Sequence, residues 1–188
     1  ASCSTEGATI YYTKDGAEPT TGSDKFPTEG VTLTETTTLK AIAVKDGLDN
    51  SEVVTATYTK LEPYASLKAL KESGIATEEG KPCVVELKDA VVTYADSRKA
   101  YIQDETAGLY VFGSNKLKAG TKLNGVVAAQ LALYFGLYEL KVDGGEFDNV
   151  AVTNDVEIPV QEVTVAELNQ NFAQYESMRV KVVDATVT

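Results

Sequence analysis

Apolar and polar residues alternate in short runs along the first third of the chain. In residues 38–44, TLKAIAV, the even-numbered positions face away from the odd-numbered ones, with the period of two that is expected of a β-strand. Ile42 lies at the centre of this strand and is predicted to be buried. Similar short runs predict further strands at Ala8–Thr13, Val31–Thr34 and Val53–Thr59. Short strands separated by Gly and Asx turns favour an immunoglobulin-like β-sandwich over residues 1–60.

Two segments of this region carry a specific motif. Residues 7–20 read GATIYYTKDGAEPT, and residues 36–58 read TTTLKAIAVKDGLDNSEVVTATY. Across residues 2–58 the sequence resembles the C-terminal domain of chitobiase and β-hexosaminidase enzymes. The resemblance implies an accessory module with no catalytic residues of its own. Domains of that family usually begin with a Pro-rich strand, so we expect this segment to lack its first edge strand.

Residues 61–188 are predicted to begin with a hinge and a short helix. Pro63 disfavours helical backbone at Glu62, which predicts a hinge at Leu61–Pro63. In residues 65–74, Leu67 and Leu70 share one face, which predicts an amphipathic helix. The apolar runs that follow predict strands at Cys83–Thr93, Leu123–Leu133 and Leu137–Val142.

A hairpin lies at the centre of this second region. Residues 100–113, AYIQDETAGLYVFG, predict strands at Tyr101–Asp104 and Leu109–Phe112, joined by a turn over residues 105–108. Gly108 is predicted to supply the positive φ that such a turn usually requires. One long strand, a hairpin and two more strands follow the order of a five-stranded OB barrel.

The hairpin also carries a second resemblance. Over residues 65–150 the pattern VELKDAVVT, AYIQDETAGLYVFG, LKAGTKLNGVVAAQ and YFGLYELK is similar to the OB domains of secreted nucleases and surface lipoproteins of Bacteroidetes-type bacteria. We therefore predict an all-β protein in two domains. An immunoglobulin-like sandwich occupies residues 1–60 and an OB-fold barrel occupies residues 61–188, with short helices near 65–74 and 165–172.

The end of the chain partly repeats the sequence of the first predicted barrel strand. Cys83–Thr93, CVVELKDAVVT, and Met178–Thr188, MRVKVVDATVT, agree at five of their eleven positions. Each is preceded by a short Leu-containing helix, and Thr164 is predicted to cap the second one. Residues 164–188 either complete the first barrel or begin a second OB unit. An exposed lone strand would be prone to aggregation, so an ordered tail favours docking onto the first barrel.

Charge and composition exclude several classes of chemistry. The chain has a net charge of −11 and contains no histidine. Catalytic triads and zinc sites that use histidine are therefore excluded within this chain, and an acidic surface makes nucleic acid an unlikely partner. No apolar run is long enough for a membrane helix, and the polar, strand-like first residues do not have the pattern of a signal peptide. Cys3 and Cys83 are predicted to be free, buried thiols, with a single long-range disulfide as the alternative.

Two acidic segments are candidates for chemistry, and both favour a structural role. Asp104 and Glu105 are adjacent, so on a strand they point to opposite faces, and Asp104 is predicted to accept hydrogen bonds from its own turn. Residues 46–51, DGLDNS, have enough oxygen atoms for calcium but lack the spacing of an EF-hand loop, so a plain turn is favoured. We predict no catalytic residues, no metal and no cofactor.

The aromatic residues of the hairpin are the best candidates for ligand binding. Tyr101 and Gln103 share one face of the first strand, and Tyr110 and Phe112 share one face of the second. An OB barrel commonly binds bases or sugars on the face of these two strands, where aromatic rings stack on the ligand. Alternatively, about half of the aromatic set, which also includes Tyr134, Phe135 and Tyr138, fills the barrel core.

These features predict a non-enzymatic accessory or binding segment of a larger exported protein. We expect it outside the cytoplasm, in the periplasm, at the outer-membrane surface or in the extracellular space. The expected partners are a glycan or another surface protein. The alternative function is an OB nucleic-acid-binding module that accompanies a secreted nuclease encoded outside this segment.

Overall fold

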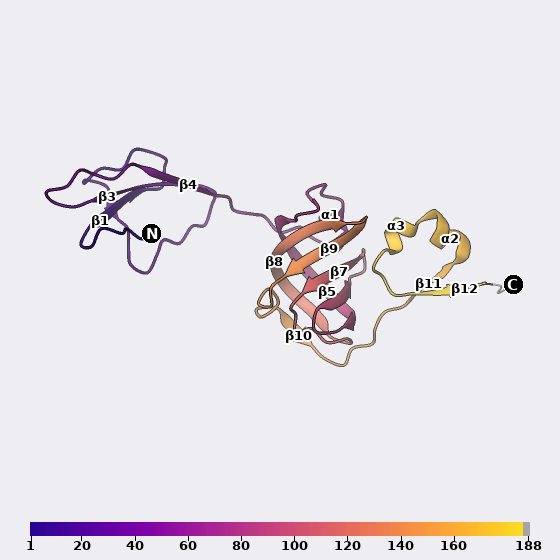
Figure 1. The fold of residues 1–188 in the computed structure, drawn as a ribbon. Coiled ribbons are helices and arrows are strands. Elements are labelled where there is room, and N and C mark those ends of the chain that lie inside the picture. The colour runs from indigo at the N-terminus through magenta and orange to yellow at the C-terminus, as the bar shows by residue number, and fades with distance from the viewer. Residues whose placement is uncertain (186–188) are drawn as a thin grey trace. The chain divides into compact units, whose positions relative to one another are not determined.

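The computed structural model describes residues 1–185 and divides the chain into two compact, β-rich units, Ala1–Leu61 and Glu62–Thr188 (Figure 1). Short helices occur only in the second unit among the described residues. None of these helices is long and apolar enough to cross a membrane.

The N-terminal unit is one antiparallel sheet of four strands in the order β2-β1-β3-β4. The strands are β1 (Thr9–Thr13), β2 (Asp24–Lys25), β3 (Thr37–Val44) and β4 (Val54–Tyr58). The predicted strand at Val31–Thr34 is wrong. That segment follows a turn in which the Gly30 amide donates to the Pro27 carbonyl, and it alternates between half-buried and exposed positions without joining the sheet.

Both faces of this sheet bury a side chain. Tyr11 is paired with Ile42 and Tyr12 with Ala41, so Tyr12 and Ile42 lie on opposite faces. The Tyr12 ring packs edge-on against Phe26 at 5.2 Å between centroids. Ile42 is only 6% exposed, which confirms the prediction that it is buried.

Replacing Ile42 by alanine should lower the free energy of unfolding of the N-terminal unit by about 2 kcal/mol. This is the lower end of the range for a buried isoleucine, because a sheet of one layer can relax around the gap. Urea unfolding followed by circular dichroism measures the loss. Val54→Ala, on the exposed strand β4, is the matched control and should cost less than about 0.5 kcal/mol. Equal losses from the two substitutions would place Ile42 outside any core.

The second unit contains a closed barrel of five strands, as predicted. Strand order around the barrel is β5-β6-β7-β9-β8 and back to β5, and β7 and β9 are the one parallel pair. The strands are β5 (Lys81–Ala95), β6 (Lys99–Gln103), β7 (Gly108–Gly113), β8 (Lys122–Tyr134) and β9 (Leu137–Val142). A short strand, β10 (Ala151–Thr153), pairs with β8 outside the barrel.

The barrel closes because β5 and β8 are long enough to pair on both sides. β5 pairs with β8 along its first part and with β6 along its last part, and β8 continues from β5 to β9. The pairing of β5 with β8 shifts register between Leu87 and Ala90, and Asp89 between them has a φ of 52°. Such a bulge bends a strand and lets it serve two sides of a barrel.

Alternate residues of these strands fill the barrel. Helix α1 (Leu67–Lys71) covers one end, and its N-cap Ser66 accepts a hydrogen bond from the Ala69 amide. The predicted helix over residues 65–74 is therefore present but shorter. The largest fully buried side chains of the barrel and α1 are Leu67, Leu70, Val85, Leu87, Val92, Ile102, Leu109, Val111, Leu123, Val127, Leu131 and Leu140.

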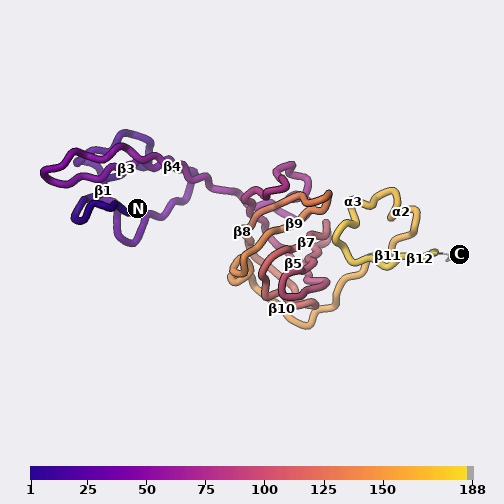
Figure 2. Tube along the Cα trace, viewed as in Figure 1, coloured from indigo at the N-terminus to yellow at the C-terminus, as the bar shows by residue number. Residues whose placement is uncertain are grey.

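The C-terminal segment, residues 160–185, follows the barrel as a separate small element (Figure 2). It consists of β11 (Gln161–Thr164), α2 (Val165–Gln170), α3 (Phe172–Tyr175) and β12 (Val180–Val183), with β11 and β12 paired in parallel. Thr164 caps α2 as predicted, and Glu167 completes a capping box. The predicted helix over 165–172 ends at Gln170, and the last residues of the predicted strand Met178–Thr188, residues 186–188, lie outside the described part of the chain.

Candidate functional site on the outer face of β6 and β7

Every second side chain of strands β6 and β7 points out of the barrel. Ala100, Ile102, Leu109 and Val111 are completely buried in the core, so the residues between them face outward. Register places these outward residues opposite one another in the pairs Lys99 with Phe112, Tyr101 with Tyr110, and Gln103 with Gly108. All four predicted binding residues, Tyr101, Gln103, Tyr110 and Phe112, therefore lie on one outer face.

Four rings form a continuous aromatic row on this face, made of Tyr94, Tyr101, Tyr110 and Phe112. Successive ring centroids are 6.3, 5.1 and 6.2 Å apart. The Arg98 guanidinium lies over the Phe112 ring at 5.6 Å from its centroid, within the range of a cation–π contact. The rings do not fill the core, so the aromatic row is available to shape an outer surface.

Exposure is uneven along the aromatic row. Tyr94 is 51% exposed, Tyr101 and Phe112 are half-buried, and Tyr110 is only 8% exposed. Burial raises the pKa of the Tyr110 hydroxyl, and the nearby Tyr101, Glu139 and Asp96 add to the shift. Tyr110 therefore contacts the neighbouring rings of the row but offers little exposed surface of its own to a ligand.

Tyr94 was not among the predicted binding residues. The pairing of β5 with β6 shifts register between Val92 and Tyr94, and this shift sets Tyr94 opposite Tyr101. Strand alternation alone cannot locate such a shift. The nearby sequence YADSRK contains an Asx turn signal, which indicates where β5 ends but not how its last residues pair.

Asp96 organises the turn that carries Arg98 to the aromatic row. Its carboxylate accepts hydrogen bonds from the backbone amides of Arg98 at 2.8 Å and Lys99 at 2.7 Å, and from the Tyr94 hydroxyl at 3.4 Å. These hydrogen bonds, led by the one from the Arg98 amide, lower the pKa of Asp96. The turn thus holds an anionic side chain and a cationic one beside Tyr94.

The C-terminal segment covers the other end of the outer face. The Arg179 amide donates to the Gln103 side-chain oxygen at 2.9 Å, and the Ser177 backbone lies directly over Gly108. A Cβ on Gly108 would lie 2.6 Å from the Met178 nitrogen and overlap Ser177. Gly108 has no positive φ, so the predicted reason for this glycine is wrong: the close approach of another backbone requires it.

Gln103 therefore has a structural partner. Its side chain is buried, and its amide oxygen is occupied by the Arg179 amide. A ligand can reach the part of the outer face that is formed by Tyr94, Tyr101, Phe112 and the neighbouring Arg98. Sequence alone could not show this, because the covering residues are far away in the chain.

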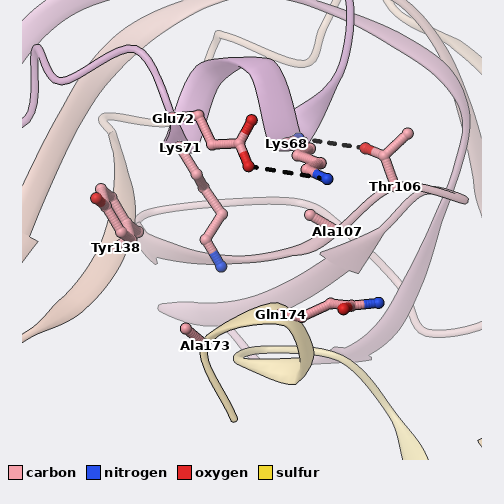
Figure 3. A pocket seen from close by; sticks show the side chains of 8 residues that line it. All are labelled: Lys68, Lys71, Glu72, Thr106, Ala107, Tyr138, Ala173 and Gln174. Carbon is pink, nitrogen blue, oxygen red and sulfur yellow. Dashed lines mark hydrogen bonds and ion pairs between the residues drawn. The ribbon is translucent and has the colours of Figure 1, made fainter. Parts of the chain in front are cut away.

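A cavity of about 370 Å³ lies where α1, the β6–β7 turn and α3 meet (Figure 3). Lys71 reaches from α1 into this region, where its ammonium lies 3.3 Å from the Glu176 carboxylate and 5.5 Å from the centre of the Tyr138 ring. The ammonium also donates to the Gly108 carbonyl at 3.3 Å. Lys71 thus forms an ion pair and a hydrogen bond, and it joins the C-terminal segment to the barrel.

The remaining aromatic candidates lie away from the row. Tyr134 and Phe135 form an edge-on pair at the tip of the β8–β9 hairpin, with centroids 4.6 Å apart. Phe135 is 92% exposed and has a φ of 49°. Tyr138 packs against the core beside Lys71.

The acidic candidates Asp104 and Glu105 differ in their surroundings, and Asp104 has a structural role. Asp104 accepts hydrogen bonds from its own turn, as predicted, and Glu105 is exposed. No group of three or more potential ligand side chains in the described residues is arranged to hold a metal ion.

Cys3 and Cys83 are free, but Cys3 is exposed, contrary to prediction, because it lies outside the N-terminal sheet. Cys83 is in the barrel core, and its burial raises the pKa of the thiol to about 11.

Comparison with known proteins identifies only the first part of the chain. Residues 1–55 match the family described as chitobiase/beta-hexosaminidase C-terminal domain. No curated protein and no solved structure matches the chain.

Proposed function

We propose that this chain is a non-catalytic accessory segment of a larger exported cell-surface protein, and that the aromatic row on its barrel binds glycans. The single observation that carries the proposal is the position of Tyr94, Tyr101, Tyr110 and Phe112 on the outside of the barrel. Aromatic side chains normally contribute to a core, and a continuous row of them on an outer surface favours stacking on a ligand with flat apolar faces.

The strand order supports an OB-type barrel. Its closing pair, β7 with β9, is parallel, and three of the four rings of the aromatic row lie on the hairpin that follows the first long strand. OB barrels bind oligosaccharides and oligonucleotides on this hairpin face. The match of residues 1–55 to a domain of glycan-cleaving enzymes favours the oligosaccharide.

Charge also favours a neutral ligand. The chain carries a net charge of −11, and the two cations at the row, Arg98 and Lys99, have the Asp96 carboxylate beside them. Glu139 adds a further carboxylate next to Tyr110. A phosphate backbone is bound through several lysines and arginines with release of counterions, and this surface offers little of that kind. Nucleic acid is the second candidate, supported by Arg98 and the aromatic row.

We expect a chito-oligosaccharide to bind the full chain weakly, with little dependence on salt. Tyr101→Ala should weaken this binding about tenfold, a loss within the roughly 1–3 kcal/mol that one ring contributes when it stacks on a nucleic-acid base. Isothermal titration calorimetry and chemical-shift mapping measure the effect. Tyr134→Ala removes a more exposed ring, 55% exposed, that lies outside the aromatic row, and it should leave the affinity unchanged.

The same titration with a dT oligonucleotide, at about 150 mM salt and below, separates the two candidates. Salt-sensitive oligonucleotide binding that Tyr101→Ala abolishes would replace the glycan with nucleic acid. Loss of affinity from both Tyr101→Ala and Tyr134→Ala would show that the aromatic row is not the site. Thermal melting of each variant checks that the barrel is intact.

A further inference from the structure

The C-terminal segment repeats the way in which the first barrel begins. When residues 178–188 are aligned with residues 83–93, Val84 corresponds to Arg179 and Val85 to Val180. The Tyr64 amide donates to the Val84 carbonyl at 2.9 Å, and the Gln161 amide donates to the Arg179 carbonyl at 3.2 Å. Both pairings are parallel, and both precede a helix: Tyr64 forms an isolated bridge two residues before the cap of α1, and Gln161 begins β11 three residues before the cap of α2. The same backbone hydrogen bond therefore occurs at equivalent positions of β5 and β12.

The two helices begin in the same manner. Ser66 caps α1 through the Ala69 amide, and Thr164 caps α2 through the Glu167 amide. Both caps accept from the third residue after them, as N-caps do. The first and fourth residues after each cap are apolar, Leu67 and Leu70 in α1 and Val165 and Leu168 in α2. The helices thus present the same apolar pattern.

The strands that follow share an unusual backbone conformation. Asp89 has a φ of 52° at the bulge of β5, and Asp184, its equivalent, has a φ of 56° just after β12. Positive φ is uncommon for residues other than glycine. Its recurrence at equivalent aspartates indicates that β12 bends as β5 does, where β5 begins to serve the second side of its barrel.

The two copies differ in how well they are covered. Leu67 and Leu87 are completely or almost completely buried, whereas their equivalents Val165 and Val182 are 44% and 41% exposed. Helix α2 has no buried residue. Among the described residues β12 pairs only with β11, whereas β5 has the strands β6 and β8 along its edges. Val163 of β11 is buried, at 1% exposed, but the other apolar side chains of the C-terminal segment are exposed or only partly buried.

We propose that the C-terminal segment is the opening β-α-β element of a second barrel built like the first. Strands equivalent to β6–β9, which follow it in the same polypeptide, cover its apolar face and pair with β12. The contacts of Ser177 with Gly108, Arg179 with Gln103 and Glu176 with Lys71 then form the junction between the two barrels.

Hydrogen exchange tests the proposal in two forms of the protein, the 188-residue chain and the polypeptide extended to the end of its coding sequence. In the 188-residue chain, the amides of β12 should exchange at least about 100-fold faster than those of β5, because the segment lacks its core. In the extended polypeptide they should become as protected as β5. A coding sequence that stops at Thr188, or protection that does not change on extension, would overturn the proposal.

A pair of substitutions tests which face becomes covered. Val182→Asp should leave the melting temperature of the 188-residue chain unchanged and should abolish the added protection in the extended polypeptide. Lys181→Thr changes the opposite face of the same strand and should leave the protection intact in both forms. Protection that rises with protein concentration in the 188-residue chain would show that a second copy covers this face, and would overturn the assignment to following strands.

Discussion

Replacing Gly113 by alanine should cost the barrel about 5 kcal/mol or more, enough to prevent it from folding in many conditions. Gly113 ends β7 opposite Val142 of β9, in the parallel pair that closes the barrel. Its φ is 123°, a conformation that L side chains rarely adopt, and a Cβ there would overlap the Val142 carbonyl oxygen. Backbone atoms of a central strand cannot move away without opening the β7–β9 pairing. Urea unfolding followed by circular dichroism measures the loss.

Gly136→Ala is the matched control for this substitution. Gly136 also has a positive φ, 84°, but a Cβ there would meet no atom within 4 Å. The strain of positive φ alone should therefore cost about 1 kcal/mol at Gly136. If both variants lose the same stability, the conformation rather than the close approach to Val142 makes Gly113 necessary.

Strand alternation predicted most of the barrel strands, and it predicted which binding residues share a face within each strand of the hairpin. The side chains of β6 and β7 point alternately into the barrel and out of it, so Tyr101 with Gln103, and Tyr110 with Phe112, could be assigned to shared faces from sequence alone. Val31–Thr34 shows the limit of this signal. It alternates in burial like a strand, but a strand also requires a neighbour that receives its backbone hydrogen bonds.

The parts of the site that the sequence did not predict depend on contacts between distant residues. Tyr94 joins the aromatic row through a register shift, which depends on how two strands pair. Gln103 and Gly108 lie under residues about seventy positions later, so neither their burial nor the reason for the glycine is visible locally. Alternation groups residues on faces, but which face points out of the barrel and which of its residues a ligand can reach are tertiary properties.

Replacing Asp104 by alanine should lower the stability of the barrel by about 4 kcal/mol, because buried amides that lose their acceptor cost roughly 1–3 kcal/mol each. One carboxylate oxygen of Asp104 accepts from the Thr106 amide at 2.7 Å, the Thr106 hydroxyl at 2.6 Å and the Ala107 amide at 2.9 Å. The other accepts from the Leu67 amide at 2.9 Å, at the start of α1. This buried side chain thus fixes the β6–β7 turn and attaches α1 to it.

Two further variants determine which oxygen matters. Asp104→Asn keeps one acceptor oxygen for the turn but directs an NH₂ group at the Leu67 amide, so it should cost about half as much, near 2 kcal/mol. Glu105→Ala removes the adjacent, exposed carboxylate and should cost less than about 0.5 kcal/mol. Chemical denaturation of the three variants gives the comparison. If Asp104→Ala is no more harmful than Glu105→Ala, the attachment of α1 does not depend on this carboxylate, and the buried Leu67 and Leu70 hold the helix by packing alone.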